Sequence, residues 1–332
     1  MQHWIYAEGA DRDVVVSTRI SFARNIAGLP FPAAMTEEQR TTLIETVAPS
    51  PESSGLARCR WDDLTAWERQ AMVERRLVNP IFFSGQTKRA VFASEDQQLA
   101  VSVGGQDHLK LQVLAAGLAL EEAYARLDAL DTAMDADLHF AFDPRLGYLT
   151  QSPSDLGTAM HASVYLHLPA LQRSRFIYEL GNTVAKLGLS LSSVYGETGK
   201  SGCSLYQLSN RVTLGISEQA AISNLASFAR QIVRQERLAR EELRGQPTTE
   251  DRVWRSYALM KNARLMPLDE CRTLWSNVRV GAAMGILPDL TLETVDALLL
   301  AIGGATVMSI VGKELDQTEL DQERATIVRE RV

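Results

Sequence analysis

The sequence contains little cysteine, and none of it is arranged as a metal site or a disulfide framework. The three cysteines among 332 residues, Cys59, Cys203 and Cys271, lie far apart and form no CxxC pair. Sparse thiols at unrelated spacings are typical of proteins from reducing compartments. We therefore expect three unpaired thiols, no bound metal ion and a cytoplasmic location.

Long apolar runs and an excess of basic residues are also missing. The most apolar stretch, ALLLAIGGATVMSIVG, is shorter than the roughly 20 residues that cross a bilayer and is interrupted by glycines. The N-terminal residues MQHWIYAEGADRD lack the basic start and apolar stretch of a signal peptide. The net charge of −7 excludes a general nucleic-acid binder, which would be basic. The sequence therefore predicts a protein that binds neither membranes nor nucleic acid.

The periodicity of apolar residues changes once along the chain. Up to about residue 216, short segments with alternating apolar and polar residues are typical of strands in an antiparallel sheet. These segments are RAVFAS, QLAVSV, ASVYLHLPAL, LSLSSVYGE and LYQLSNRVTLG. From residue 217 on, the periodic segments are helical. The predicted fold class is therefore α+β, with an antiparallel sheet flanked by helices and followed by an all-helical C-terminal domain.

Helices are predicted where apolar residues recur at a spacing of three and four. The segment TEEQRTTLIETV begins with a capping box formed by Thr36 and Gln39. Residues 109–131 and 170–188 have helical spacing, and Ser217 caps a long, charged helix over residues 217–244.

The segment VGGQDHLKLQ, residues 103–112, lies at the end of a predicted strand, where enzymes often place catalytic side chains. It contains two glycines and a glutamine before Asp107 and His108. These last two residues are either an acid–base pair or residues with a positional role.

Four stretches, in this order along the chain, resemble the bacterial protein-arginine kinases of the McsB type, which are ATP:guanido phosphotransferases related to creatine and arginine kinases. They are VVVSTRISFARNI, VGGQDHLKLQ, GYLTQSPSDLGTAMHASVYLHLPAL and VYGETGKSGCSLYQLSNRVTLG, and the tail segments EDRVWRSYALMKNAR and NVRVGAAMG match as well. The resemblance implies a phosphagen-kinase-like domain over residues 1–216, with a small helical part of about 1–75 and a sheet domain of about 76–216. Residues 217–332 would resemble the phosphoarginine-binding domain.

The resemblance also implies which positions would bind MgATP and transfer its γ-phosphoryl group to a protein arginine. The nucleotide-binding positions of the family correspond to Ser17, Thr18, Arg19, Ser21, Lys110, His161, Ser163, Ser192 and Glu197. Arg19 either holds a phosphate or forms a structural ion pair. His161 is either a weak anion ligand or a strand residue without a ligand.

Several of these positions depart from the family pattern. The two catalytic glutamates are replaced by Gly105 and Gln106, and the cysteine beside the substrate is Ser152. Loss of a general base typically lowers a rate by about 10² to 10⁴. In the tail, Leu320 replaces the arginine of the phosphoarginine pocket, whereas Asp321 is kept. These departures predict a pseudokinase that serves as an interaction scaffold or regulator in protein quality control, with both sites lost.

Two other hypotheses remain open at this stage. One is an active phosphotransferase with altered chemistry, in which Asp107, His108 or Lys110 takes a new role. The other is a sensor that binds nucleotide without turnover. MgATP is the only cofactor implied, if nucleotide binding is retained. By resemblance, the expected protein partner is a McsA-like activator, a Clp unfoldase or a repressor, and the helical tail offers a surface for a homo-oligomer.

Overall fold

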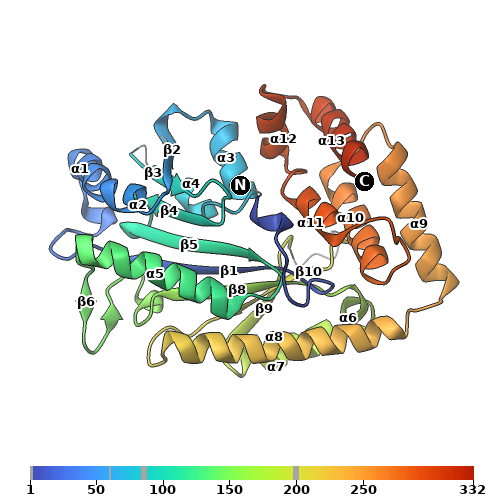
Figure 1. Cartoon of the computed structure of the whole chain (residues 1–332), viewed down its shortest axis with the longest axis horizontal. Helices are drawn as coiled ribbons and strands as arrows, with labels where there is room; N and C mark the ends of the chain where they lie inside the picture. The colour runs from blue at the N-terminus through green and yellow to red at the C-terminus, as the bar shows by residue number, and fades with distance from the viewer. Residues whose placement is uncertain (1–2, 60, 84–87, 197–201) are drawn as a thin grey trace.

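The computed structural model describes residues 3–59, 61–83, 88–196 and 202–332, which form an eight-stranded antiparallel sheet surrounded by helices (Figure 1). The strand order is β2-β3-β4-β5-β1-β8-β10-β9. Their bounds are β1 Val15–Arg24, β2 Ala57–Cys59, β3 Ala90–Ala93, β4 Leu99–Val103, β5 Leu109–Ala116, β8 Met160–His167, β9 Leu189–Ser193 and β10 Leu205–Asn210; β6 Phe142–Asp143 and β7 Gly147–Tyr148 form a separate hairpin. The predicted α+β class with an antiparallel sheet is confirmed.

Strand β1 lies in the middle of the sheet, between β5 and β8. The prediction that residues 1–75 form a small helical part is therefore wrong for this segment. Successive side chains of a strand point to opposite faces, so Ile20 and Phe22 enter the hydrophobic core, whereas Arg19 and Ser21 face a pocket on the other side of the sheet.

The prediction of a helix over residues 109–131 is wrong for its first part, because residues 109–116 form β5. The first half of this strand, LKLQV, alternates between apolar and polar residues as a strand does, but its second half, VLAA, is apolar and buried at every position and runs on into the apolar residues before α5. Gly117 follows with φ of 63°, and a Cβ atom there would lie 2.6 Å from the carbonyl oxygen of Ala10. The chain turns at this glycine, and helix α5 begins only at Leu120.

The helices before residue 217 largely follow their local signals. The capping box of Thr36 and Gln39 is present at the start of α1. The single helix predicted over residues 170–188 is divided at Arg175, which has φ of 62°. The α-helical bounds are α1 Glu37–Val47, α2 Pro49–Ser53, α3 Ala66–Glu74, α4 Pro80–Phe83, α5 Leu120–Leu138, α6 Pro169–Arg173 and α7 Ile177–Ala185, with short 3-10 helices η1 Trp4–Tyr6, η2 Pro32–Ala34, η3 Trp61–Asp63 and η4 Pro153–Asp155.

The described residues after Asn210 form helices and no strand. They are α8 Glu218–Glu241, α9 Pro247–Asn262, α10 Leu268–Ala283, α11 Leu292–Leu299, α12 Gly304–Val311 and α13 Gln317–Arg331. Ser217 caps α8 as predicted. However, α8 lies with α5 along one face of the sheet, and its residues Ile222 and Leu225 belong to the same core as Ile20 (Figure 1). By packing, α8 therefore belongs with the sheet rather than with the C-terminal helices, where the predicted division at residue 217 placed it.

No single helix in the described ranges has the length and apolar composition needed to cross a membrane. Helices α11 and α12 satisfy that criterion only as a pair, and the angle between them is 98°.

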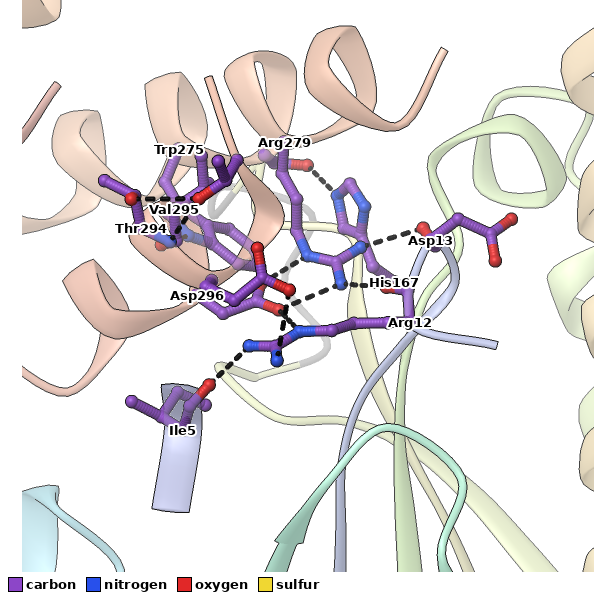
Figure 2. A network of polar contacts seen from close by, with 12 residues as sticks. Ile5, Arg12, Asp13, His167, Trp275, Arg279, Thr294, Val295 and Asp296 are labelled. Atoms are coloured by element: carbon purple, nitrogen blue, oxygen red, sulfur yellow. Dashed lines mark hydrogen bonds and ion pairs between the residues drawn. The ribbon is translucent and has the colours of Figure 1, made fainter. Parts of the chain in front are cut away.

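A buried polar network joins the N-terminal segment to the C-terminal helices (Figure 2). Nε of Arg279 on α10 lies 2.6 Å from Oδ1 of Asp296 on α11, and both side chains are 0% exposed. Arg12 approaches the second oxygen of Asp296 at 3.5 Å. Arg279 also donates to the backbone oxygens of Arg12 and Asp13, at 2.8 and 3.0 Å. The segment that leads into β1 is thus held between the sheet and the C-terminal helices.

Candidate active site

A pocket of about 300 Å³ opens on the face of the sheet opposite to α5 and α8. It is formed where β1, β5, β8 and β10 meet the loop after β4 and helix α4. Eight of the residues predicted from the sequence line it: Arg19, Ser21, Gly105, Gln106, Asp107, Lys110, His161 and Ser163. The strand register explains this grouping, because Ser21 lies opposite both Gln112 and His161, and Arg19 lies opposite Ser163.

Arg19 and Lys110 give the pocket two positive charges. Arg19 donates to Oε1 of Gln112 at 2.9 Å, and the amide of Gln112 is held by the backbone oxygens of Arg76 and Leu77 at 2.7 and 2.8 Å. Within the described ranges, neither Arg19 nor Lys110 forms an ion pair with a carboxylate. Two partly buried cations that no described carboxylate contacts at ion-pair distance are an arrangement suited to an anionic ligand. The structural ion pair considered for Arg19 is thus not found among the described residues.

Burial, together with repulsion from Arg19, lowers the pKa of Lys110 to about 8. The carboxylates of Asp155 and Asp107 act in the opposite direction but have smaller effects. Lys110 is therefore a cation at neutral pH whose burial destabilises the folded protein.

Lys110→Met is expected to raise the free energy of unfolding at pH 7. Well below pH 8, the buried charge of Lys110 is fully present in the folded protein. As the pH rises from about 8 to about 10.5, the unfolded state binds more protons than the folded state. The free energy of unfolding of the wild type therefore rises over this range. The variant should lack this gain. Urea unfolding at pH 7 and pH 9.5 measures both effects. Lys186→Met, at an exposed helix end, is the control. A less stable Lys110 variant, or one with an unchanged pH slope, contradicts the prediction.

His161 and Asp155 form a second polar feature of the pocket. Nε2 of His161 lies 3.1 Å from Oδ1 of Asp155, with side-chain exposures of 38% and 22%. The hydrogen bond from His161 lowers the pKa of Asp155, which is therefore ionised near neutral pH. A carboxylate only accepts hydrogen bonds, so Nε2 carries the hydrogen and Nδ1 of a neutral imidazole has a free lone pair.

Asp107 and His108 are held by structural hydrogen bonds. Nδ1 of His108 accepts from the backbone N–H of Ile26 at 2.9 Å, and Nε2 donates to the carbonyl of Pro30 at 2.8 Å. Burial lowers the pKa of His108, which favours the neutral ring. Oδ1 of Asp107 accepts from Asn25 at 2.7 Å and from the backbone of Gln151 at 2.8 Å. This geometry favours the positional interpretation of both residues, although Asp107 also lines the pocket.

The first of the family's two glutamate positions, Gly105, lies at the edge of the pocket next to an aromatic ring. A Cβ atom at Gly105 would lie 3.2 Å from Cδ2 of Phe82, which itself packs edge-on against Trp61 with ring centroids 4.9 Å apart. Gly104 has φ of 83°, and a Cβ atom there would meet the carbonyl oxygen of Lys88 at 2.9 Å. The local packing is therefore adapted to glycine at both positions.

Two residues of β1 face away from the pocket. Thr18 accepts from the backbone of Ala119 at 3.1 Å and donates to the carbonyl of Gly117 at 2.7 Å, so it secures the start of α5. Arg24 is buried in an ion pair with Asp131, with 2.8 Å between Nη2 and Oδ2. The family-based assignment of Thr18 to nucleotide binding does not fit its orientation, because even-numbered residues of β1 point into the core.

The remaining predicted positions lie outside the pocket. Ser17 is buried near Trp4 and Arg76, and Oγ of Ser152 bonds to Ser154 at 2.7 Å. Ser192 is exposed and lines a separate cavity beside α7. Glu197 lies outside the described residues.

In the C-terminal helices, Oδ1 of Asp321 accepts from Arg324 at 2.6 Å, and Leu320 packs against a small apolar cluster. The carboxylate of Asp321 is thus engaged by its own helix. Loss of the phosphoarginine pocket stays a prediction.

Eight pocket residues were not predicted as site residues from the sequence, and three of them, Phe82, Asp155 and Gln207, bear on the chemistry of the site. Asp155 lies within the stretch SDLGT, which carried the resemblance but suggested only a turn. Gln207 donates to Ser163 at 2.9 Å. It occurs at an alternating position of a predicted strand, so the period of two could have predicted which face of the sheet it lies on. Phe82 has no local signal that would place it here.

Comparisons with known proteins agree with this geometry. Residues 36–239 match the family model "ATP:guanido phosphotransferase, C-terminal catalytic domain", and residues 246–332 match the "Protein-arginine kinase McsB C-terminal domain". The protein-arginine kinase of Clostridium acetobutylicum is 35% identical over 337 residues, with 99% of each chain covered. This chain belongs to the protein-arginine kinase family. The protein-arginine kinase of Symbiobacterium thermophilum is 36% identical over 338 residues, covering 99% of this chain and 96% of the relative.

Solved structures show the same fold outside the protein-arginine kinase family. Lombricine kinase has a TM-score of 0.63 at 19% identity, covering 70% of this chain and 69% of that one. The substrate-free taurocyamine kinase from Schistosoma mansoni has a TM-score of 0.62 at 24% identity, covering 74% of this chain and 38% of that one. The two family models divide the chain after α8, between residues 239 and 246, in agreement with the packing of α8 on the sheet.

Proposed function

We propose that this member of the protein-arginine kinase family binds MgATP in the sheet pocket and transfers its γ-phosphoryl group with an altered set of catalytic residues. The observation that carries the proposal is the convergence of two cations, Arg19 and Lys110, from the adjacent strands β1 and β5, on one pocket. Phosphoryl transfer requires cations around the phosphates more than it requires covalent chemistry by the protein.

The pocket residues fit a triphosphate. Arg19 supplies a planar guanidinium that binds two phosphate oxygens at once, and Lys110 supplies a compact charge. Bound phosphate would favour the protonated form of Lys110, so nucleotide binding above pH 7 should be accompanied by proton uptake. The hydroxyl groups of Ser21 and Ser163 supply neutral donors on the same face. ATP, when bound with magnesium, supplies the phosphoryl group.

A second candidate function is the pseudokinase scaffold. It is favoured by Gly105 and Gln106, which place no carboxylate at the family's catalytic positions. The names of the relatives, and the cations kept in the pocket, support the phosphotransferase over the scaffold. Turnover separates the two candidates, because the scaffold releases no phosphate from ATP.

Titration calorimetry of the full chain with MgADP and MgATP is expected to show saturable binding. Arg19→Met should weaken it by about tenfold to 150-fold, because a hydrogen bond to a charged group contributes about 1.5–3 kcal/mol. Arg244→Met is the matched control, since this exposed arginine pairs only with Glu241 in the described structure. Circular dichroism verifies folding. Absence of heat with both nucleotides would refute the proposal, and binding without turnover would leave the sensor or the scaffold.

A further inference from the structure

We propose that the phosphoryl acceptor in this pocket is a hydroxyl group, of water or of an alcohol, rather than a guanidinium, and that His161 oriented by Asp155 takes its proton. This inference rests on the proposed binding of MgATP and names the acceptor class and the base for that same site. The two residues form a dyad within the pocket, with 3.1 Å between Nε2 of His161 and Oδ1 of Asp155.

The carboxylates of the pocket that belong to the described residues are not placed to orient a guanidinium acceptor. A guanidinium is always protonated and is best oriented by a carboxylate that accepts two of its hydrogen bonds. Of the two carboxylates that line the pocket in the described ranges, Asp107 accepts from Asn25 and Gln151, and Asp155 is engaged by His161. A neutral hydroxyl does not need a carboxylate that accepts two hydrogen bonds.

The dyad has the arrangement of an oriented general base. Asp155 comes from the η4 turn and His161 from β8, so the carboxylate fixes the imidazole from outside the sheet. Because Nε2 donates to Asp155, Nδ1 is the basic nitrogen of the neutral ring. No hydrogen bond to Nδ1 is formed by the residues that the structure describes. A carboxylate that holds a histidine in one tautomer is the recurring support of histidine bases.

The step balances as follows. The acceptor oxygen forms a bond to the γ-phosphorus while the bond from that phosphorus to the bridging oxygen of ADP breaks, and the electron pair stays on ADP. The hydroxyl proton moves to Nδ1 of His161, and Asp155 stabilises the resulting imidazolium. Lys110 and Arg19 balance the negative charge on the departing diphosphate. The products are ADP and either inorganic phosphate or a phosphate ester.

Among the residues that the structure describes, four charged groups share the pocket with His161. They are Arg19 from β1, Lys110 from β5, Asp155 from η4 and Asp107 from the loop after β4. A pH profile of turnover reports on all of them, so variants are needed to identify the contribution of the dyad.

The test is a labelled-phosphate assay on the full chain with Mg[γ-³²P]ATP, alone and with casein. Three products are measured: inorganic phosphate, acid-stable label on protein oxygens, and acid-labile label on arginine nitrogens. Wild type is expected to give inorganic phosphate or acid-stable label and no acid-labile label. His161→Gln should lower the rate by about 10²- to 10⁴-fold, with MgADP affinity changed by less than about tenfold.

Two further variants separate catalysis from structure. Asp155→Asn should lower the rate less than His161→Gln does. Because Asp155 acts through His161, the variant should also move the acidic limb of the pH–rate profile. A change in rate without a change in pH profile would assign Asp155 a structural role only and would overturn its part of the inference. His139→Asn, at the exposed C-cap of α5, is the control for a histidine replacement and should retain wild-type turnover.

The outcomes distinguish this inference from the proposed function. Acid-labile label on casein as the main product overturns the hydroxyl acceptor. An unchanged rate in His161→Gln overturns the base. MgADP binding without release of phosphate to water or casein overturns the inference but leaves nucleotide binding in place. No nucleotide binding overturns the proposed function and the inference together.

Discussion

Replacing Asp296 by alanine is expected to lower the free energy of unfolding by about 3–5 kcal/mol, the loss typical of breaking a buried ion pair from one side. Asp296 is 0% exposed and lies 2.6 Å from Arg279, which is equally buried. Arg12 is 3.5 Å from the same carboxylate. The variant leaves the buried guanidinium of Arg279 without a counterion and Arg12 with only the half-exposed Glu293, and the remaining hydrogen bonds to backbone oxygens do not balance the charge.

Urea unfolding followed by tryptophan fluorescence measures this loss, since Trp275 donates to the carbonyl of Val295 beside the network. Glu293→Gln is the matched control: Glu293 lies on the same helix and 3.4 Å from Arg12, but its side chain is 39% exposed. Exposed pairs contribute about 0–1 kcal/mol. Equal losses in the two variants would show that the buried pair is not what holds the N-terminal segment.

The triple variant Phe82→Leu, Gly105→Glu, Gln106→Glu should phosphorylate protein arginine, which wild type is not expected to do, because a general base contributes about 10² to 10⁴ in rate. The two glutamates restore carboxylates that orient a guanidinium and accept its proton. Phe82→Leu is needed because a Cβ atom at Gly105 would lie 3.2 Å from the Phe82 ring, and an overpacked site costs about 1–3 kcal/mol. Acid-labile label on casein is the readout.

Three controls isolate the cause of any gain. Phe82→Leu alone should give no acid-labile label, and Gln106→Glu alone, at an exposed position, should give little because one carboxylate does not hold both edges of a guanidinium. The pair Gly105→Glu, Gln106→Glu with Phe82 intact should be less stable and slower than the triple variant. A folded triple variant that binds MgATP but labels no arginine would show that the acceptor site was rebuilt beyond these three positions.

Local signals in the sequence identified those elements whose stabilising contacts are themselves local. Thr36 and Ser217 bond to backbone N–H groups three residues on, so both helix starts were predictable. Strand β5 was mistaken for a helix because its second half, residues 113–116, is apolar and buried on both faces, which hides the alternation that Lys110 and Gln112 give its start. The place of β1 in the middle of the sheet depends on pairing with strands far away in the sequence, which periodicity does not reveal.

The candidate site was predictable as a set of residue types but not as an arrangement. Matching a motif to Thr18, Arg19 and Arg24 does not show which face of the sheet each side chain lies on. The period of two along β1 does so, because it places Arg19 on the face opposite to Thr18 and Arg24. The contact between Phe82 and Gly105 joins α4 to the loop after β4, and the dyad of Asp155 and His161 joins a turn to a strand. Such contacts depend on how loops pack, for which the sequence carries no short-range signal.

The buried place of Arg12 sets the order in which the chain can fold during synthesis. Asp296, its carboxylate partner, belongs to α11 and leaves the ribosome almost last, on the order of tens of seconds after Arg12 at about 5–20 residues per second. Strand β1, which follows Arg12, must also wait for β5 and β8 before it is paired on both edges. A chain truncated before α11 therefore has β1 paired but leaves the guanidinium of Arg12 without Asp296 and the N-terminal segment unburied, a feature by which chaperones and proteases recognise incomplete products.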